Sequence, residues 1–140
     1  MNIPRLTLRA TPREAYGEND ELEVQVELTG AKLFGTVSVF DDHRQLGWLC
    51  EAFDGFPGRQ GEESKFEMGI FAKLKLGMGS DSKGRLEVRA EITESTGGAG
   101  EILAIHFLCD PAALDTFCDQ IRSFSAGVEC EAVLQGRSWE

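Results

Sequence analysis

The sequence predicts an α+β fold in which an antiparallel β-sheet of six to eight strands carries two amphipathic helices packed on one face. Three observations predict it. Several segments alternate apolar and polar residues with a period of two, which is typical of strands with one buried and one solvated face. Two other segments repeat apolar residues at helical spacing. The length of 140 residues suits a single domain with one apolar core.

The clearest strand patterns lie at residues 22–28 and 86–92. Leucine, valine, alanine or isoleucine takes every second position there, and glutamate, glutamine or arginine takes the positions between. Weaker alternation marks residues 6–9, 33–39 and 74–78. Because Gly30 and the segment GSDSKG are typical of hairpin turns, neighbouring strands are expected to pair antiparallel.

Two helices are expected among these strands. Either Asp41 or Asp42 can cap the first helix, because both side chains accept hydrogen bonds from free backbone amides. Asp110 is expected to cap the second, with Pro111 in its first turn. The apolar stripes are Leu46, Leu49, Cys50 and Phe53 in the first helix, and Leu114, Phe117, Cys118 and Ile121 in the second. The expected order is three strands, a helix, four strands and a helix.

Two later segments complete the expected fold. Residues 101–109, EILAIHFLC, are apolar on both faces, which predicts a central or doubly covered strand. Residues 125–140 form either a C-terminal tail or an extra edge strand, because alternation returns between Val128 and Leu134. The domain is therefore expected to span residues 1–124, with residues 125–140 as its tail or edge.

The net charge of the chain indicates which classes of molecule it can bind. Acidic residues number 24 and basic residues 14, a formal net charge of -10. Such a chain repels phosphate, so neither nucleic acid nor an anionic membrane is an expected partner. A basic protein is the partner that this charge favours.

The cysteines and the first residues indicate the compartment. The opening segment MNIPRLTLRA has no signal-peptide pattern, so a cytoplasmic protein is expected. Four cysteines, Cys50, Cys109, Cys118 and Cys130, form no C-x-x-C pair and are expected to be buried, reduced thiols. Their spacing does not suit zinc, and no metal site or cofactor is expected.

Enzyme chemistry has little support in the sequence. Nucleophile-elbow, P-loop and dinucleotide-binding motifs are absent. His43 follows Asp41 and Asp42, but consecutive residues on a helix do not converge on one atom. A small enzyme or ligand carrier with a pocket near His106, between sheet and helices, stays as an alternative. Another alternative is a structural protein that assembles with itself, as in a homodimer.

A protein-binding surface is predicted on the first helix. Trp48 faces away from the apolar stripe, and exposed tryptophan is enriched at interfaces. An aromatic anchor inside an acidic rim suits a basic enzyme as partner, because charge speeds the encounter and aromatic side chains hold the complex. The predicted contacts are Trp48, Arg44, Glu51, Asp54 and Phe56, with Asp41 and Asp42 at the rim.

Residues 39–124 resemble a family of small uncharacterised bacterial domains with suspected immunity-type relatives. The matching pieces are FDGFPG at 53–58, LKLGMGSDSKGRLEVRAEI at 74–92 and the helix that begins after Asp110. The chain departs from the family pattern at Phe53, where tryptophan is expected, and it lacks the acidic glycine motif before the last helix. The resemblance implies an α+β fold and no catalytic residues. We therefore expect a non-enzymatic, acidic binding module, an immunity protein that inhibits a basic toxin.

Overall fold

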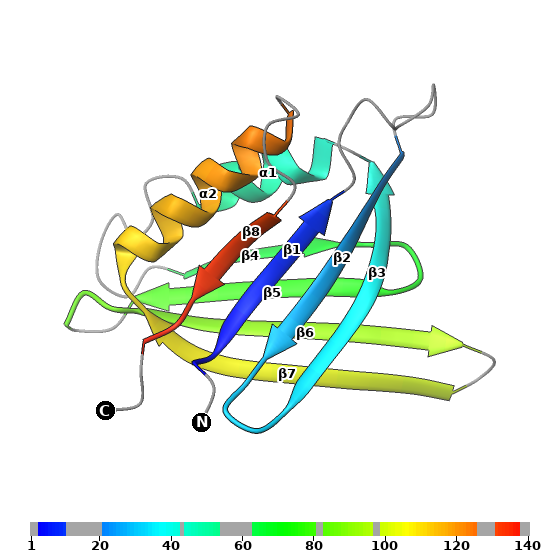
Figure 1. Cartoon of the computed structure of the whole chain (residues 1–140), viewed down its shortest axis with the longest axis horizontal. Coiled ribbons are helices and arrows are strands. Elements are labelled where there is room, and N and C mark those ends of the chain that lie inside the picture. The colour runs from blue at the N-terminus through cyan, green and yellow to red at the C-terminus, as the bar shows by residue number, and fades with distance from the viewer. Residues whose placement is uncertain are drawn as a thin grey trace.

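A computed structural model describes the chain over residues 3–10, 21–42, 44–53, 63–80, 83–96, 99–125 and 131–137. Within these residues, eight strands and two helices follow one another in the predicted order, with a strand at the last position (Figure 1). In chain order they are β1 (Arg5–Ala10), β2 (Glu21–Thr29), β3 (Phe34–Asp42), α1 (Arg44–Phe53), β4 (Glu63–Met68), β5 (Lys73–Ser80), β6 (Leu86–Thr96), β7 (Ala99–Cys109), α2 (Pro111–Ser125) and β8 (Glu131–Gln135).

The strands form two sheets, so the prediction of one sheet with six to eight strands is wrong. Sheet A has the order β3-β2-β1-β8 and sheet B the order β4-β5-β6-β7, and every neighbouring pair is antiparallel. The alternation in each strand shows that one face is apolar, but an apolar face can be buried by a second sheet as well as by a helix. Here β2 and β3 pack over β6 and β7, so the two sheets bury each other.

Most of the residues predicted to face the core do so, but Leu33 of the expected strand 33–39 is 62% exposed. Leu22, Val24, Val26 and Leu28 of β2 are buried, as are the apolar side chains at alternate positions from Leu86 to Ile92 in β6. The polar residues between them face outward on the other side of each sheet. Period-two alternation therefore correctly assigned the two faces of both strands.

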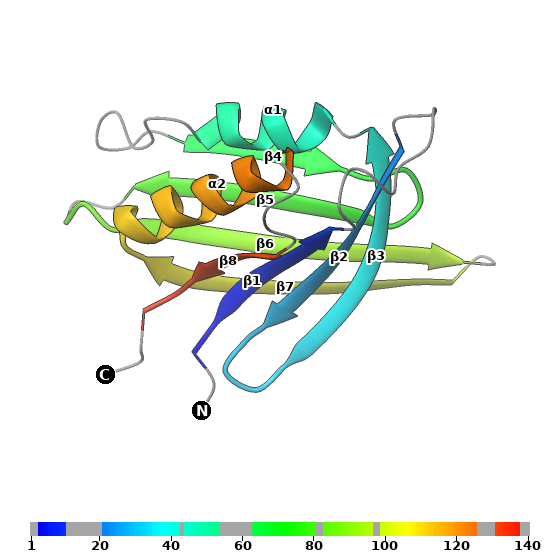
Figure 2. The same cartoon turned by 45° about the horizontal axis from the view of Figure 1, so that its top comes forward.

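Both helices lie at the side of the molecule where the two sheets diverge (Figure 2). α1 packs against β4, α2 packs along β8, and the two helices contact each other. The predicted stripes of both helices are buried, with Phe124 as a further buried residue of α2. The helices therefore close the gap between the outer strand of sheet A and the outer strand of sheet B, instead of covering one sheet face.

The segment predicted as a central or doubly covered strand is an edge strand with one covered face. β7 pairs with β6 alone, and its alternate residues Ile105, Phe107 and Cys109 enter the core. The other set faces outward, and Ile102 is 71% exposed. Its apolar character on both faces thus reflects one buried face and an outward face on which Ile102 and Ala104 are exposed and Leu108 is half-buried. His106 belongs to the outward set, so it does not lie between a sheet and the helices as the alternative required.

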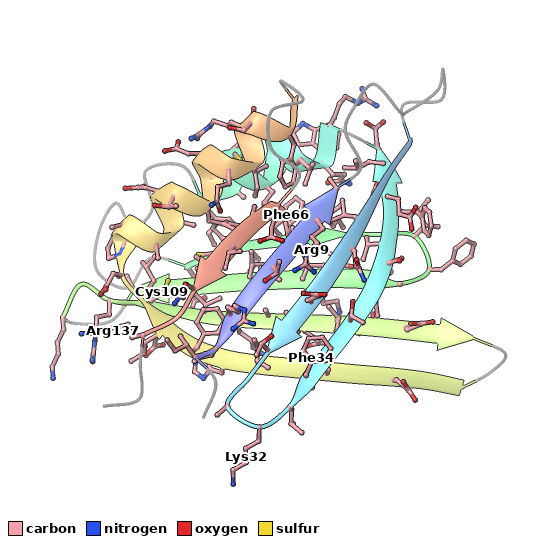
Figure 3. All side chains as sticks on the ribbon, in the orientation of Figure 1. Arg9, Lys32, Phe34, Phe66, Cys109 and Arg137 are labelled. Carbon is pink, nitrogen blue, oxygen red and sulfur yellow. The ribbon has the colours of Figure 1, made fainter. Side chains whose placement is uncertain are left out.

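The segment after α2 contains strand β8, which pairs with β1 from Arg5↔Gln135 to Arg9↔Glu131. On the outer face of sheet A, Arg9 joins β2 to β8 through ion pairs with Glu27 at 2.6 Å and Glu131 at 2.7 Å (Figure 3). The first and last described strands are therefore neighbours. Cys130 lies outside the described residues.

Candidate functional site

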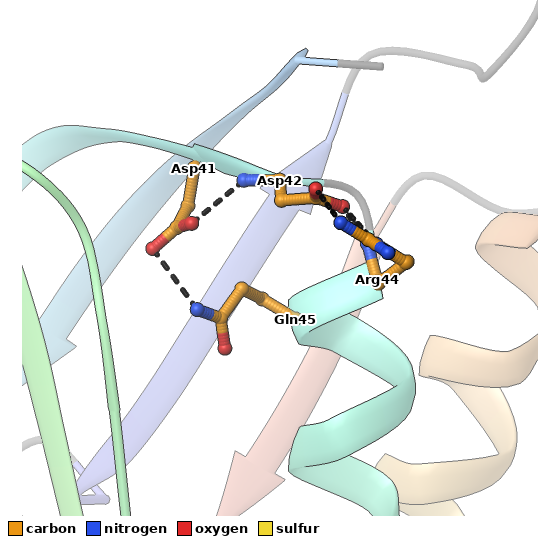
Figure 4. Close-up of polar contacts among 4 residues, drawn as sticks. All are labelled: Asp41, Asp42, Arg44 and Gln45. Carbon is orange, nitrogen blue, oxygen red and sulfur yellow. Dashed lines mark hydrogen bonds and ion pairs between the residues drawn. The ribbon is translucent and has the colours of Figure 1, made fainter.

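The predicted surface on α1 has an ordered centre. Trp48 is 47% exposed, and the guanidinium of Arg44 lies 5.7 Å from the centre of its ring. Arg44 also donates hydrogen bonds to both carboxylate oxygens of Asp42, from Nη2 at 2.6 Å and from Nε at 3.0 Å (Figure 4). The carboxylate holds the guanidinium in one orientation over the indole, so the three side chains form a stacked group.

Asp42 also caps α1, as predicted, because its Oδ1 accepts a hydrogen bond from the Arg44 backbone N–H at 2.9 Å. Asp41 has an internal role. Its half-buried carboxylate accepts from the backbone N–H of Asp42 at 2.7 Å, from Gln45 Nε2 at 3.3 Å and from the Gly69 backbone N–H at 2.7 Å. Asp41 therefore joins the end of β3, the start of α1 and the β4–β5 turn, and it has little free capacity for a partner.

The remaining predicted contacts are distributed differently. Glu51 is exposed on α1. Asp54, Phe56 and His43 lie outside the described residues. The structure thus brings together Asp42, Arg44 and Trp48, turns Asp41 inward and leaves Glu51 on the surface, and the partner-binding role of the set stays a prediction.

A second surface lies beside β3 and was not predicted. Two hollows of about 450 Å³ and about 420 Å³ adjoin each other there, because Thr36, Val37 and Glu94 line both. We call the two together the β3 groove. Its lining residues are Gln25, Phe34, Gly35, Thr36, Val37, Ser38, Phe40, Phe71, Ala72, Ile92, Glu94, Glu101, Ile102 and Leu103.

Large apolar side chains stand exposed along this groove. Phe71 is 81% exposed, Phe34 62% and Phe40 42%. Figure 3 shows Phe34 near the β2–β3 turn, on the outer side of sheet A. Single exposed apolar residues are common on proteins, but here Phe40 and Phe71 line one hollow and Phe34 lines the adjoining one, and such grouping is typical of an interaction site.

The groove also has an acidic floor. Glu94 of β6 and Glu101 of β7 are directly opposite each other, and both side chains are exposed. Neither forms an ion pair with another side chain in the described part of the chain. Like charges in directly opposed positions repel, so a cation bound between them relieves the repulsion.

A sequence signal for this groove exists. Phe34 and Phe40 occupy the outward positions of β3, in phase with Thr36 and Ser38, where polar residues are the rule. Ile70 and Phe71 form an exposed apolar pair in the β4–β5 turn. Apolar residues at positions that the pattern assigns to solvent would have identified the surface.

His106 lies on the outer face of sheet B. There it shares a row with Lys65, Gly77 and Arg89 across the four strands, beside a hollow of about 280 Å³. Cys109 points to the opposite, buried side, and burial together with the nearby Asp110 raises the pKa of its thiol to about 12. A hydrogen bond with Cys50 and burial likewise raise the pKa of the Cys118 thiol. Thiols with raised pKa values stay protonated at neutral pH and are weak nucleophiles.

Within the described ranges, no three His, Cys, Asp or Glu side chains are placed to hold a metal ion. The same ranges contain no helix with the length and apolarity needed to cross a membrane. The chain matches no family model, no curated protein and no solved structure. Its α+β fold of two four-stranded antiparallel sheets and two helices is therefore established by the structure alone, and the resemblance to immunity-type domains stays a prediction.

Proposed function

We propose that this chain is a non-enzymatic, acidic module that binds a basic protein, and that within this class it acts as an immunity protein that blocks a toxin. The observation that carries the proposal is the β3 groove, where exposed aromatic side chains surround an unpaired pair of glutamates. Aromatic residues supply contact area at interfaces, and the acidic floor selects a basic partner.

The charge of the whole chain supports the same partner. A net charge of -10 attracts a basic protein from a distance and raises the rate of encounter, most strongly at low salt. The motifs that resemble immunity-type domains support the role of inhibitor. Neither argument requires a catalytic residue.

The α1 surface and the β3 groove meet at the end of β3. Phe40 lines the groove, Asp42 follows two residues later, and Asp42 holds Arg44 over Trp48. A partner seated in the groove can therefore extend over α1, and both surfaces belong in the test.

The test is affinity capture from the native host's lysate at low salt, with mass spectrometry of the retained proteins. We expect one basic protein at near-equal stoichiometry, released by salt and lost with Phe71→Ser. Leu33→Ser is the matched control, because Leu33 is also exposed and apolar but lines neither hollow. Loss with Trp48→Ala but not with Phe71→Ser would move the site to α1.

Two outcomes contradict the proposal. Recovery of the protein itself alone, with a dimer in sedimentation, would favour the self-assembling alternative. Recovery of no protein partner would favour the small-ligand alternative, for which the hollow beside His106 offers two basic and two acidic side chains, Lys65, Arg89, Glu63 and Glu87.

A further inference from the structure

We infer that a basic, extended segment of the protein partner adds a fifth strand to sheet A at the free edge of β3. This inference rests on the proposed function, because it specifies how the β3 groove holds the partner. In strand addition, hydrogen bonds between backbones supply affinity, and alternate side chains of the added strand supply specificity.

Within the described part of the chain, each of the other three sheet edges has a covering contact or charged side chains. At the edge of β8, Gln120 of α2 accepts a hydrogen bond from the Val133 backbone N–H at 2.8 Å. At the edge of β7, the Leu108 carbonyl accepts a hydrogen bond from the Arg137 backbone N–H at 2.8 Å. β4 alternates charged residues along its length and packs against α1. Charged side chains and covering elements are the usual means of blocking an edge.

β3 has such protections only at its C-terminal end, where Asp41 and Asp42 are charged and the β4–β5 turn contacts Asp41. Its residues 34–40, FGTVSVF, include no charged residue and no proline, and in the described residues no strand pairs with the side of β3 away from β2. The strand is nine residues long. A long, uncharged edge with exposed aromatic residues is a template for another strand.

The alternation of hydrogen-bonded pairs between β2 and β3 shows which backbone groups of β3 are available to another strand. Gly30 donates its N–H to the Leu33 carbonyl at 2.7 Å, and hydrogen-bonded pairs alternate from there along an antiparallel ladder. The N–H and C=O groups of Phe34, Thr36, Ser38 and Phe40 therefore point away from β2. When the same alternation of hydrogen-bonded pairs is followed from β3 through β2 and β1 to β8, the Val133 N–H points away from β1, toward the edge of sheet A that β8 forms.

Sheet B provides a floor for the added strand. Figures 1 and 2 show β6 and β7 continuing past β3 on the side away from β2. A strand beside β3 lies about 4.8 Å from it, and so above this floor. Its inward side chains meet Phe71, Ile92, Glu94 and Glu101, which line the groove. Apolar residues and lysine or arginine suit these positions.

A second copy of this chain suits the edge poorly. β3 contains no lysine or arginine, so a β3–β3 pair brings no cation to Glu94 and Glu101. Two copies also bring together two net charges of -10. Charge complementarity therefore favours a basic segment of another protein.

The test selects 12-residue peptides from a random display library on the intact protein and measures the affinity of the selected, fluorescently labelled peptides. In the selected peptides, we expect every second position to be apolar, lysine or arginine, and the positions between them to accept any residue. N-methylation of the peptide residues whose N–H groups face β3 should weaken binding at least about tenfold. N-methylation of the residues between them, whose N–H groups point away from β3, should leave the affinity unchanged. This comparison needs no change in the protein.

Protein variants give the matched comparison. Ser38→Pro removes an N–H that points away from β2, so it costs sheet A no internal hydrogen bond, whereas Ser38→Ala keeps that N–H. Affinity should fall about tenfold in Ser38→Pro and stay within about twofold in Ser38→Ala. Glu94→Gln combined with Glu101→Gln should remove most of the salt dependence of binding.

Each other result has a defined meaning. Failure to enrich any peptide overturns strand addition, and so do peptides without basic residues or without sensitivity to N-methylation phase. If the captured basic protein still needs Phe71 but binds Ser38→Pro as tightly as the parent, the proposed function holds and strand addition is wrong. If no basic protein is captured at all, the proposed function itself fails.

Discussion

Gly69, at the start of the β4–β5 turn, gives the most demanding stability prediction. Its φ is +114°, in a region that residues with a side chain rarely adopt, and its N–H donates to Asp41 Oδ2 at 2.7 Å. A Cβ at this position collides with the Ala72 carbonyl oxygen and lies 2.9 Å from Val39 Cγ1. Gly69→Ala therefore strains the backbone and pushes the turn away from β3.

The magnitude follows from these two effects. A strained φ costs about 1–3 kcal/mol and forced repacking about 1–3 kcal/mol, so we expect a loss of about 2–6 kcal/mol. That is a large share of a typical unfolding free energy of about 5–15 kcal/mol. With a denaturant dependence of about 2 kcal/mol per molar, the urea midpoint should fall by about 2 M.

Gly77→Ala in β5 is the matched control. A Cβ there meets no atom within 4 Å, and a glycine inside a strand is itself unfavourable, so this variant should keep or raise the midpoint. Urea denaturation followed by circular dichroism measures both variants. A midpoint for Gly69→Ala within about 0.5 M of the parent would refute the reasoning, as would an equal loss in Gly77→Ala.

Three further predictions concern other parts of the fold. Burial, and secondarily the nearby Asp110, raises the pKa of the Cys109 thiol from 9.0 to about 12. The stabilising contribution of the protonated thiol is therefore complete below pH 9 and is lost as the pH rises toward 12. The urea midpoints measured at pH 8 and at pH 10 should differ less in Cys109→Ala than in the parent. Gln120→Ala leaves the Val133 N–H without its acceptor and should cost about 1 kcal/mol, with faster hydrogen exchange at that amide. Glu101→Lys replaces the repulsion from Glu94 with attraction and should stabilise the chain by about 0.2–1 kcal/mol at low salt, with weaker binding of basic peptides.

The local features of the fold were predictable from the sequence. Side-chain alternation assigned the buried faces of β2 and β6, and the cap at Asp110 and the stripe from Leu114 to Ile121 were both correct. These signals work because strand and helix periods are set by the backbone over a few residues. A helix cap likewise depends only on its first turn.

The non-local features were not predictable in the same way. Alternation shows that a face is buried but not what buries it, so it did not separate one large sheet from two sheets that pack together. EILAIHFLC carries apolar residues on both faces, yet β7 pairs only with β6. Which strands become edges depends on pairing between distant segments, and local periodicity contains no information about it.

In the candidate site, too, local features were predictable from the sequence and non-local features were not. Trp48 is exposed where helical spacing placed it, because the direction of a side chain on a helix is a local property. Asp41 turned inward because the β4–β5 turn, 28 positions along the chain, supplied the Gly69 amide. Phe34 and Phe40 mark an exposed apolar surface in the sequence, but no short segment shows that the ends of three separate hairpins meet there to form the β3 groove.

The pairing of β1 with β8 constrains how the chain folds. Arg9 and Glu131 are 122 positions apart, and closing a loop of that length costs roughly 3 kcal/mol more entropy than closing the short β2–β3 turn. Hairpins such as β2–β3 and β6–β7 can therefore form early, and β1 can pair with β2, while the other edge of β1 stays open until β8 is available. During synthesis on the ribosome, Leu6 and Leu8 emerge long before the strand that completes their sheet. Folding should end with this step, at the slower rate typical of non-local β-pairing.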